Sequence, residues 1–504
     1  MPPQVNEYRV FEKISKLKNT KSTLDIDLPN KLRKEFAVEL TAPMTDIINT
    51  SLQQQVYPTL WKKELITPVP KVTHPKQLKD LGKISSTSDF SKVFEGFLRD
   101  WLMEDILDNI DPGQYGGLKG SGSEHMLVCL VDRILQLLDV HTVQSAVIAA
   151  LVDWKAAFDM QDPTIAIQKF IKLGVRSSLI PLLISYLSGR QMRVRLNREL
   201  SSCLDLTGGG PQGTLLGLIE YLAQSNDNAD CINQADRFKY IDDLTILEIV
   251  AMASLLVEYN FLEHVASDVG CDQLFLPPES YNTQSSLDNI SEWTEENLME
   301  INSGKSSYMI FTRTKTDFAT RLTINGEKLD LAEASKLLGV WLTPQLSWSL
   351  NTKELCRKAY SRISMITKLK YAGVNTEDLL DVYVLFVRSL LEYCSAVWHS
   401  RLTVSQYSDL ERVQKICLKI ILGESYVNYT AALEMTGLDN LHSRREAKCL
   451  NFAKKCLKHP RYSKLFPLNP PKSKEKFVVN FSRGETYKQS AIPYMQRMLN
   501  TELK

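Results

Sequence analysis

The chain combines short continuous apolar runs with longer segments in which apolar residues recur at helical spacing. Residues 145–153 form an apolar run that ends in an aspartate, which is typical of a buried strand. Residues 238–247 predict two short strands around a turn that carries two adjacent aspartates, and residues 308–312 predict another strand. Helical spacing continues from about residue 350 to residue 460. The pattern therefore predicts an α+β fold, with a small antiparallel sheet and packed helices followed by an all-helical region.

The charge balance is close to neutral, with 60 Lys and Arg against 59 Asp and Glu. A nucleic-acid enzyme would then need local basic surfaces rather than a basic chain. The most apolar long stretch, Leu379 to Trp398, contains Asp381, Arg388 and Glu392. We therefore expect a buried amphipathic helix there and no membrane span.

Nine cysteines occur without any Cys-x-x-Cys pair. Their irregular spacing favours reduced thiols in an intracellular protein, in the nucleus or the cytoplasm. The tightest group of metal-ligating types is Cys449, Cys456 and His459, near His442. Because this group lacks the short pair spacing of zinc sites, we favour thiols without a metal.

Three aspartates are the main candidates for chemistry. Asp153 ends one apolar run, and Asp242 and Asp243 lie between two others. If the strands are neighbours in one sheet, these acids converge, and convergent carboxylates can hold a pair of magnesium ions. A single aspartate is more often an ordinary strand-end residue. For a Tyr-x-Asp-Asp sequence between apolar strands, a metal site and an ordinary turn are equally good interpretations.

Five motifs in order carry a family resemblance: Val152–Asp159, Gly209–Gly213, Tyr240–Asp243, Asn302–Lys305 and Leu337–Val340. The series resembles that of reverse transcriptases, and it is most similar to those of non-LTR retrotransposons. Each motif alone is weakly specific, whereas five in order are strongly specific. The resemblance implies a right-hand polymerase fold. It places an N-terminal helical extension at 1–60, fingers and palm at 61–345, a helical thumb and C-terminal region at 346–465, and a loosely structured tail at 466–504.

The same resemblance implies an RNA-directed DNA polymerase, with an RNA template, a DNA primer and deoxynucleoside triphosphates as partners. It implies two Mg²⁺ ions, for which Mn²⁺ may substitute, held by Asp153 and Asp242 with Asp243 as a supporting acid. Lys305 would be the general acid for pyrophosphate, unless it is a solvated turn lysine. Phe158 would crowd a ribose 2′-hydroxyl, unless it is a core aromatic. Contacts with substrate are expected from Lys71, Lys83, Gly209, Gln212, Gly213 and Tyr240, and template contacts from Gln114–Gly117.

Two departures put nucleotide affinity in doubt. Gly82 stands where the family has an arginine, and Lys83 offers only a point charge in its place. Gly217-Leu218 stands where the family commonly has Gly-Pro. The alternative function is therefore a catalytically inactive, domesticated or degenerate copy that binds RNA or DNA. An RNA-templated RNA polymerase is disfavoured by Phe158, because such an enzyme needs room for the 2′-hydroxyl.

Basic residues recur in the helical region. Lys353, Arg357, Lys358 and Arg362 would form a stripe on one helix face that suits nucleic-acid phosphates. Arg412, Lys415 and Lys419 make a second stripe, and a solvated helix face explains either one equally well. About sixty residues precede the expected fingers, too few for an endonuclease, so we expect a fragment of a longer polyprotein or a truncated copy.

Overall fold

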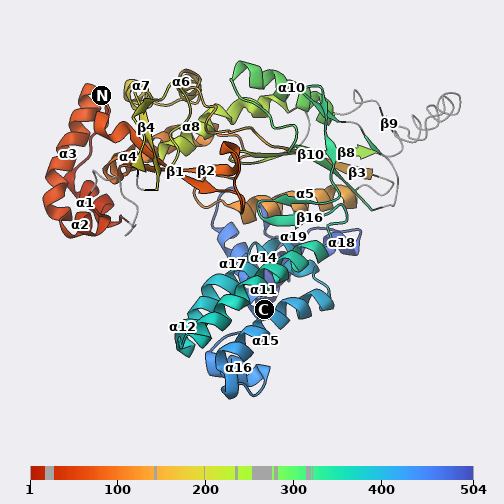
Figure 1. The fold of residues 1–504 in the computed structure, drawn as a ribbon. Coiled ribbons are helices and arrows are strands. Elements are labelled where there is room, and N and C mark those ends of the chain that lie inside the picture. The colour runs from red at the N-terminus through yellow and green to blue at the C-terminus, as the bar shows by residue number, and fades with distance from the viewer. Residues whose placement is uncertain are drawn as a thin grey trace.

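The computed structural model describes residues 2–17, 28–140, 145–197, 199–232, 236–251, 275–276, 282–313, 319–320 and 322–502. Two sheets and their helices form an upper body, and further helices extend below it (Figure 1). The expected α+β class is confirmed. At one end lie three N-terminal helices: α1 (Glu7–Ser15), α2 (Asn30–Glu35) and α3 (Ala37–Gln54).

The first sheet has the order β2-β1-β4-β5, with β6 also paired to β4. Strands β1 and β2 form an antiparallel hairpin, and β1 pairs with β4 in parallel. Four helices pack in the core beside it: α4 (Asp89–Ile106), α6 (Pro163–Lys172), α7 (Ile180–Leu187) and α8 (Leu216–Gln224). The strands are β1 (Lys63–Pro70), β2 (Leu81–Thr87), β4 (Gln191–Leu196), β5 (Glu199–Leu200) and β6 (Leu204–Asp205).

The second sheet has the order β14-β10-β3-β8-β7, and its central pairs are antiparallel. One face of β3 packs against α5 (Ser123–Val140) and the other against α10 (Asn282–Glu296). Both faces are therefore buried, which explains why β3 is apolar without alternation. The strands are β3 (Ser145–Val152), β7 (Asp236–Tyr240), β8 (Asp243–Ala251), β10 (Ser307–Thr312) and β14 (Asp330–Leu331).

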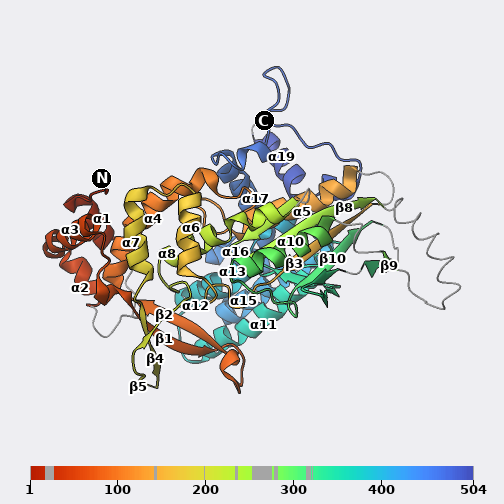
Figure 2. The ribbon, with the colours of Figure 1, turned by 90° about the horizontal axis from the view of Figure 1, so that it is seen from above.

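The chain from residue 349 onward is mainly helical, as expected, and it packs under α5 (Figures 1 and 2). Residues 466–502 are more ordered than their polar composition predicted. Their last helix buries Ala491, Ile492, Met495 and Leu499 in the same core as α5. The helices are α11 (Ser349–Tyr371), α12 (Thr376–Val382), α14 (Ser395–Trp398), α15 (Val404–Leu422), α16 (Tyr429–Thr436), α17 (Leu441–Leu457), α18 (Glu485–Lys488) and α19 (Ala491–Glu502).

Two further sequence expectations concern membrane spans and cysteines. Among the described residues, no helix combines the length and apolar character that crossing a bilayer requires. All eight cysteines in the described ranges are free thiols. Burial raises the pKa of Cys449 and of Cys456 to about 12, so both thiols stay protonated at neutral pH.

Candidate active site

The three aspartates meet at one end of the second sheet. Val152, the last residue of β3, pairs with Leu244 of β8. Asp153 directly follows this pair on one strand, and Asp243 directly precedes it on the other. Asp242 lies in the two-residue turn that joins β7 to β8. Burial raises the pKa of Asp243 to about 6, and the charges of Asp242 and Asp153 add to the rise. The pKa of Asp242 is likewise raised, by burial and by Asp153. The carboxylates are thus close enough to repel one another.

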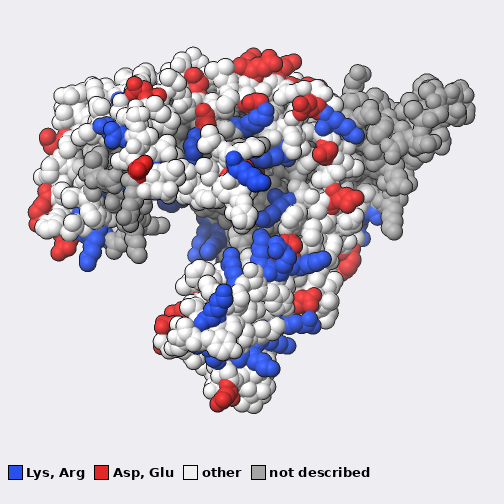
Figure 3. Space-filling view, in the orientation of Figure 1, with Lys and Arg blue, Asp and Glu red and all other residues white. Residues whose placement is uncertain are grey.

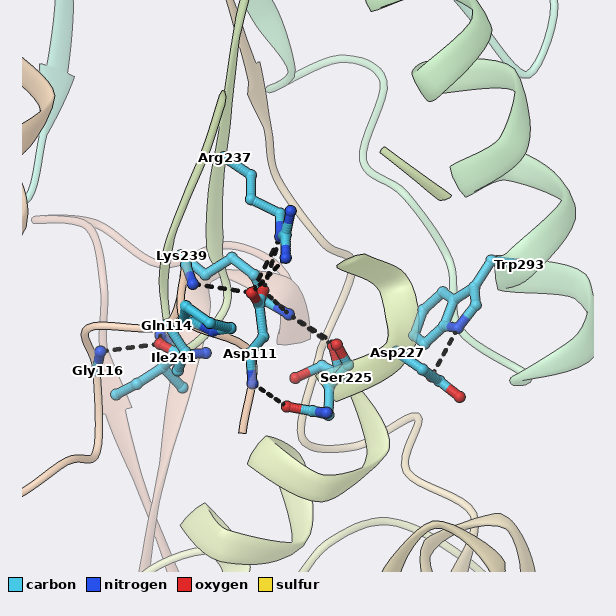
Figure 4. A network of polar contacts seen from close by, with 12 residues as sticks. Asp111, Gln114, Gly116, Ser225, Asp227, Arg237, Lys239, Ile241 and Trp293 are labelled. Carbon is cyan, nitrogen blue, oxygen red and sulfur yellow. Dashed lines mark hydrogen bonds and ion pairs between the residues drawn. The ribbon is translucent and has the colours of Figure 1, made fainter. Parts of the chain in front are cut away.

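The turn that carries Asp242 is strained and is held by a neighbouring segment. Ile241 has φ +58°, which is unfavourable for a β-branched residue. Its backbone N–H donates to the side-chain oxygen of Gln114 at 3.0 Å, and the Gly116 N–H donates to the same oxygen at 2.8 Å (Figure 4). A Cβ at Gly116 would lie 2.6 Å from the Ile241 nitrogen. Gln114 and Gly116 therefore support the aspartate turn, a role that sequence reasoning did not assign to them.

A buried ionic network lies beside this turn. Lys239, in β7, is 2% exposed and places its ammonium 3.3 Å from the Asp111 carboxylate and 2.8 Å from the Ser225 carbonyl (Figure 4). Arg237 forms a second ion pair with Asp111, at 2.8 Å. Burial alone would raise the pKa of Asp111, but Lys239 and Arg237 outweigh it, so the pKa is lowered. The side-chain charges of Asp111, Arg237 and Lys239 are thereby held in place beside β7, the first strand of the β7–β8 hairpin.

Lys305 reaches the aspartates because a turn packs against the end of β3. The Asn302 N–H donates to the Asp153 carbonyl at 2.8 Å, and the Asp153 N–H donates to the Ser306 hydroxyl at 3.0 Å. This turn places the Lys305 ammonium 3.7 Å from an Asp153 carboxylate oxygen. The lysine side chain is 72% exposed, so it can move toward a substrate.

Phe158 is half-buried and packs against Tyr221 from α8, with ring centroids 5.1 Å apart and ring planes tilted by 33°. The Tyr221 hydroxyl is buried and makes no hydrogen bond to any residue that the structure describes. Burial raises its pKa well above the usual value, and the charges of Asp242 and Asp243 raise it further. Phe158 therefore lies over a tyrosine that adjoins the acidic cluster, and Tyr221 was not anticipated from the sequence.

The glycine turn and the loop after β3 are joined by main-chain hydrogen bonds. The Gly210 N–H donates to the Phe158 carbonyl at 2.7 Å, and the Gly209 N–H donates to the Gln161 carbonyl at 2.8 Å. Gly209 and Gly213 have φ of +88° and +76°, a region that favours glycine. A Cβ at Gly213 would lie 2.4 Å from the carbonyl oxygen of Ser85 in β2. The turn therefore packs closely between β2 and the Phe158 loop.

Two of the expected substrate contacts meet at Asp159. Lys83 of β2 and Gln212 of the glycine turn both contact one Asp159 carboxylate oxygen, at 2.5 and 2.8 Å. Lys83 and Asp159 are exposed and Gln212 is half-buried, so the contacts can open to a ligand. The aliphatic part of Lys71 lies against Gly82, where a Cβ would be 3.2 Å from the lysine Cε. Tyr240 is half-buried against the core under the sheet.

The basic residues of α11 do not share one face. Lys353 and Arg357 line a groove of about 720 Å³ between α11 and α15, and Arg412 of α15 lines it too. Lys358 instead lies near Lys336, and Arg362 donates to the Phe386 carbonyl. The expectation of a single stripe was wrong, because a step of five residues turns about 140° around a helix.

The arrangement of the three aspartates suits a bound divalent cation, because without one their negative charges repel one another. Among the described residues, one Asp153 carboxylate oxygen is buried without a hydrogen bond, and Lys305 is the one cation within 4 Å of it. Carboxylate oxygens are the ligands that Mg²⁺ prefers, and a cation would relieve the mutual repulsion. Asp153, Asp242 and Asp243 are therefore the residues that could hold a metal here. Of the cysteine and histidine group noted in the sequence, Cys449, Cys456 and His459 belong to no cluster of metal-ligating side chains within the described residues, whereas His442 does belong to one.

Comparison with known proteins adds an independent result. No protein-family model matches the chain. The chain is 24% identical over 459 residues to the probable RNA-directed DNA polymerase from transposon BS of Drosophila melanogaster, which covers 88% of this chain and 47% of that protein. It is 24% identical over 416 residues to the probable RNA-directed DNA polymerase from transposon X-element of the same fly, with coverages of 82% and 43%.

A third relative is the RNA-directed DNA polymerase from mobile element jockey of Drosophila melanogaster. It is 23% identical over 337 residues, with coverages of 64% and 33%. The chain thus spans less than half the length of these relatives. Nevertheless, the similarity extends over most of this chain in the first two cases. The chain is a homologue of the RNA-directed DNA polymerases of non-LTR retrotransposons.

Proposed function

We propose that the chain extends a DNA primer on an RNA template, with a right-hand polymerase arrangement. In this proposal the first sheet belongs to the fingers, the second sheet forms the palm, and the helices from α11 onward form the thumb and C-terminal region. The observation that carries the proposal is the meeting of Asp153, Asp242 and Asp243 at one end of the second sheet. A pair of Mg²⁺ ions bound between these carboxylates would offset their mutual repulsion and so stabilise this arrangement.

Within the proposal, each group at the site has one task. Asp153 and Asp242 would hold the ions, and Asp243 would add negative charge beside them. Bound Mg²⁺ would lower the pKa of the primer 3′-hydroxyl and neutralise charge on the triphosphate. Lys305 would donate a proton to the departing pyrophosphate, because its exposed ammonium already lies near Asp153. Gln114 and Lys239 would keep the Asp242 turn in place through the contacts of Figure 4.

Nucleotide selection would depend on the loop after β3. Phe158 would occupy the space of a ribose 2′-hydroxyl, and Tyr221 behind it would prevent the ring from retreating. Gln212 and Lys83 would exchange their contacts with Asp159 for contacts with the incoming nucleotide. Lys83 is exposed and Gln212 is half-buried, and neither belongs to the hydrophobic core, so the exchange needs no change there.

The template and primer would lie in the hollow between the upper body and the lower helices. Lys and Arg side chains gather around this hollow, whereas acidic side chains lie mostly toward the outer edges of the same face (Figure 3). Lys353, Arg357 and Arg412 would contact phosphates from the groove between α11 and α15. Such binding would depend on salt concentration rather than on sequence.

One observation favours the second candidate function, an inactive copy that only binds nucleic acid. Gly82 offers no side chain for a triphosphate, and the Lys71 stem lies over it. Lys71 could supply the missing charge, since its position is exposed. The two functions therefore differ in whether the intact acidic cluster supports turnover.

Primer extension on a homopolymer RNA template, with Mg²⁺ or Mn²⁺, distinguishes them. Wild type should extend, Asp242→Asn should not, and Asp46→Asn, an exposed control in α3, should extend like wild type. Binding of the template–primer duplex is measured in parallel, and it should survive in all three proteins. Duplex binding without extension by wild type would favour the inactive copy.

A further inference from the structure

A second cluster of metal-ligating side chains lies outside the candidate active site. His399 comes from a short helix of residues His399–Arg401, and His442 and Glu446 come from α17. His442 and Glu446 are four residues apart, so they project from the same side of the helix. One ligand atom from each of the three residues lies within 4.8 Å of the other two. The chain thus joins two histidines and one carboxylate from elements about forty residues apart.

The imidazole of His399 is buried without a hydrogen-bond partner among the described residues. The residue is 0% exposed, and neither ring nitrogen makes a hydrogen bond within the part of the chain that the structure describes. Its ring is surrounded by those of Tyr407, His442 and Tyr494, with centroids 5.6, 5.2 and 6.0 Å away. Buried polar side chains nearly always have a partner, so a buried imidazole with none points to a missing ligand.

Arg445 brings a buried positive charge to the edge of the cluster. It is 0% exposed, and its guanidinium carbon lies 5.8 Å from the centroid of the Tyr407 ring. The Glu446 carboxylate supplies the negative charge that would offset both Arg445 and a bound cation.

Glu446 is oriented by a neighbour outside the cluster. The Tyr494 hydroxyl donates to one Glu446 oxygen at 3.3 Å, and the other oxygen lies 3.4 Å from His442 Nδ1. Zinc bonds of about 2.0–2.1 Å at tetrahedral angles separate two ligand atoms by about 3.4 Å. His442 and Glu446 already have this separation, and a small movement of His399 would complete the set.

We propose that His399, His442 and Glu446 bind one Zn²⁺ ion. Two histidines and one glutamate are a donor set typical of zinc, with the fourth position open. The His442 and Glu446 side chains are 45% and 40% exposed, so water can supply the fourth ligand and the ion can enter from that side. The ion would tie the segment after α14 to α17, and it has no part in the chemistry at the aspartates.

Metal analysis of the full chain tests the proposal. The protein is stripped with a chelator, reloaded with Zn²⁺, dialysed and measured by mass spectrometry. Wild type should retain one Zn²⁺ per chain. His442→Gln and Glu446→Gln should each weaken Zn²⁺ affinity by at least about tenfold, as loss of a ligand should exceed the effect of an outer-shell change. His74→Gln, an exposed histidine between β1 and β2, should retain the ion and controls for surface binding.

A measurement that needs no variant guards against misfolding. Co²⁺ added to stripped wild type should give the strong visible absorption of tetrahedral coordination, and Zn²⁺ should abolish it. Retention of one Zn²⁺ with this spectrum, lost in both α17 variants, supports the site. Retention no greater than background, or equal retention in all four proteins, overturns it.

Discussion

Lys239 and Asp111 form an ion pair of 3.3 Å that is almost completely buried, and Lys239 precedes the Asp242 turn by three residues. Removing one member of such a pair leaves the other charge without compensation. We therefore expect Lys239→Met to lower the free energy of unfolding by about 3 kcal/mol. Primer extension should fall as well, since the turn loses its support.

Urea denaturation measures this change, and Lys454→Met is the matched control. Lys454 pairs with Glu502 at the surface, where both side chains are about 40% exposed. An exposed pair contributes less than about 1 kcal/mol, so the control should unfold like wild type. Equal stability of the two variants would mean that the buried pair does not hold the hairpin.

Gly213 allows the glycine turn to approach β2. Gly213→Ala would place a Cβ 2.4 Å from the Ser85 carbonyl at a φ of +76°. We expect a loss of about 2 kcal/mol in the free energy of unfolding, together with a lower kcat/KM for nucleotide. At Gly208 the nearest atom to a Cβ is 3.8 Å away, so Gly208→Ala should leave stability unchanged or slightly higher. Thermal unfolding and steady-state extension check both variants.

The parts of the fold that could be predicted depend on short-range pattern. An apolar run ending in aspartate gave β3 and Asp153, and the Tyr-x-Asp-Asp hairpin followed from strand signals on both sides. The partners of Lys239 and Phe158 could not be found in this way. Asp111 lies 128 residues before Lys239, and Tyr221 lies 63 residues after Phe158. No local periodicity encodes such contacts.

Two other differences have physical reasons. The basic residues of α11 include steps of five, which move a side chain off the first face. The chain after residue 466 is polar on average, but the few apolar residues of α19 lie on the side that meets α5. His442 and Glu446 could have been recognised from their four-residue spacing, whereas His399 could not.

Phe158 should control the choice of sugar. Its ring is held by Tyr221 at a centroid distance of 5.1 Å, so it cannot yield without a change in α8. We expect Phe158→Ala to reduce the preference for dTTP over UTP by about tenfold or more, which corresponds to about 1.4 kcal/mol. The ratio of kcat/KM in single-nucleotide extension measures it. Phe481→Ala, whose ring is 81% exposed, should keep the wild-type ratio. An unchanged ratio of kcat/KM in Phe158→Ala would show that the Phe158 ring packs in the core and does not select the sugar.

The raised pKa of Asp243 predicts a dependence of stability on pH. Burial, Asp242 and Asp153 raise the pKa to about 6, whereas an unfolded aspartate has a pKa of about 3.9. Between about pH 4 and pH 6 the folded state therefore holds its proton more tightly than the unfolded state does. Stability of the metal-free protein should fall as pH rises through this range, and above it the ionised Asp243 remains a destabilising charge.

Asparagine at this position cannot ionise, so Asp243→Asn should be more stable than wild type above pH 6. After allowance for solvent, the gain should be about 1–2 kcal/mol, and it should vanish as pH falls to about 4. Urea unfolding from pH 4 to pH 8 in a chelator measures it, with Asp46→Asn as an exposed control. Adding Mg²⁺ should reduce the difference in unfolding free energy between Asp243→Asn and wild type, because the ion stabilises the wild-type cluster more than the variant. A gap that is constant with pH would show that Asp243 carries no excess charge repulsion, and the acids would then be too far apart to share an ion.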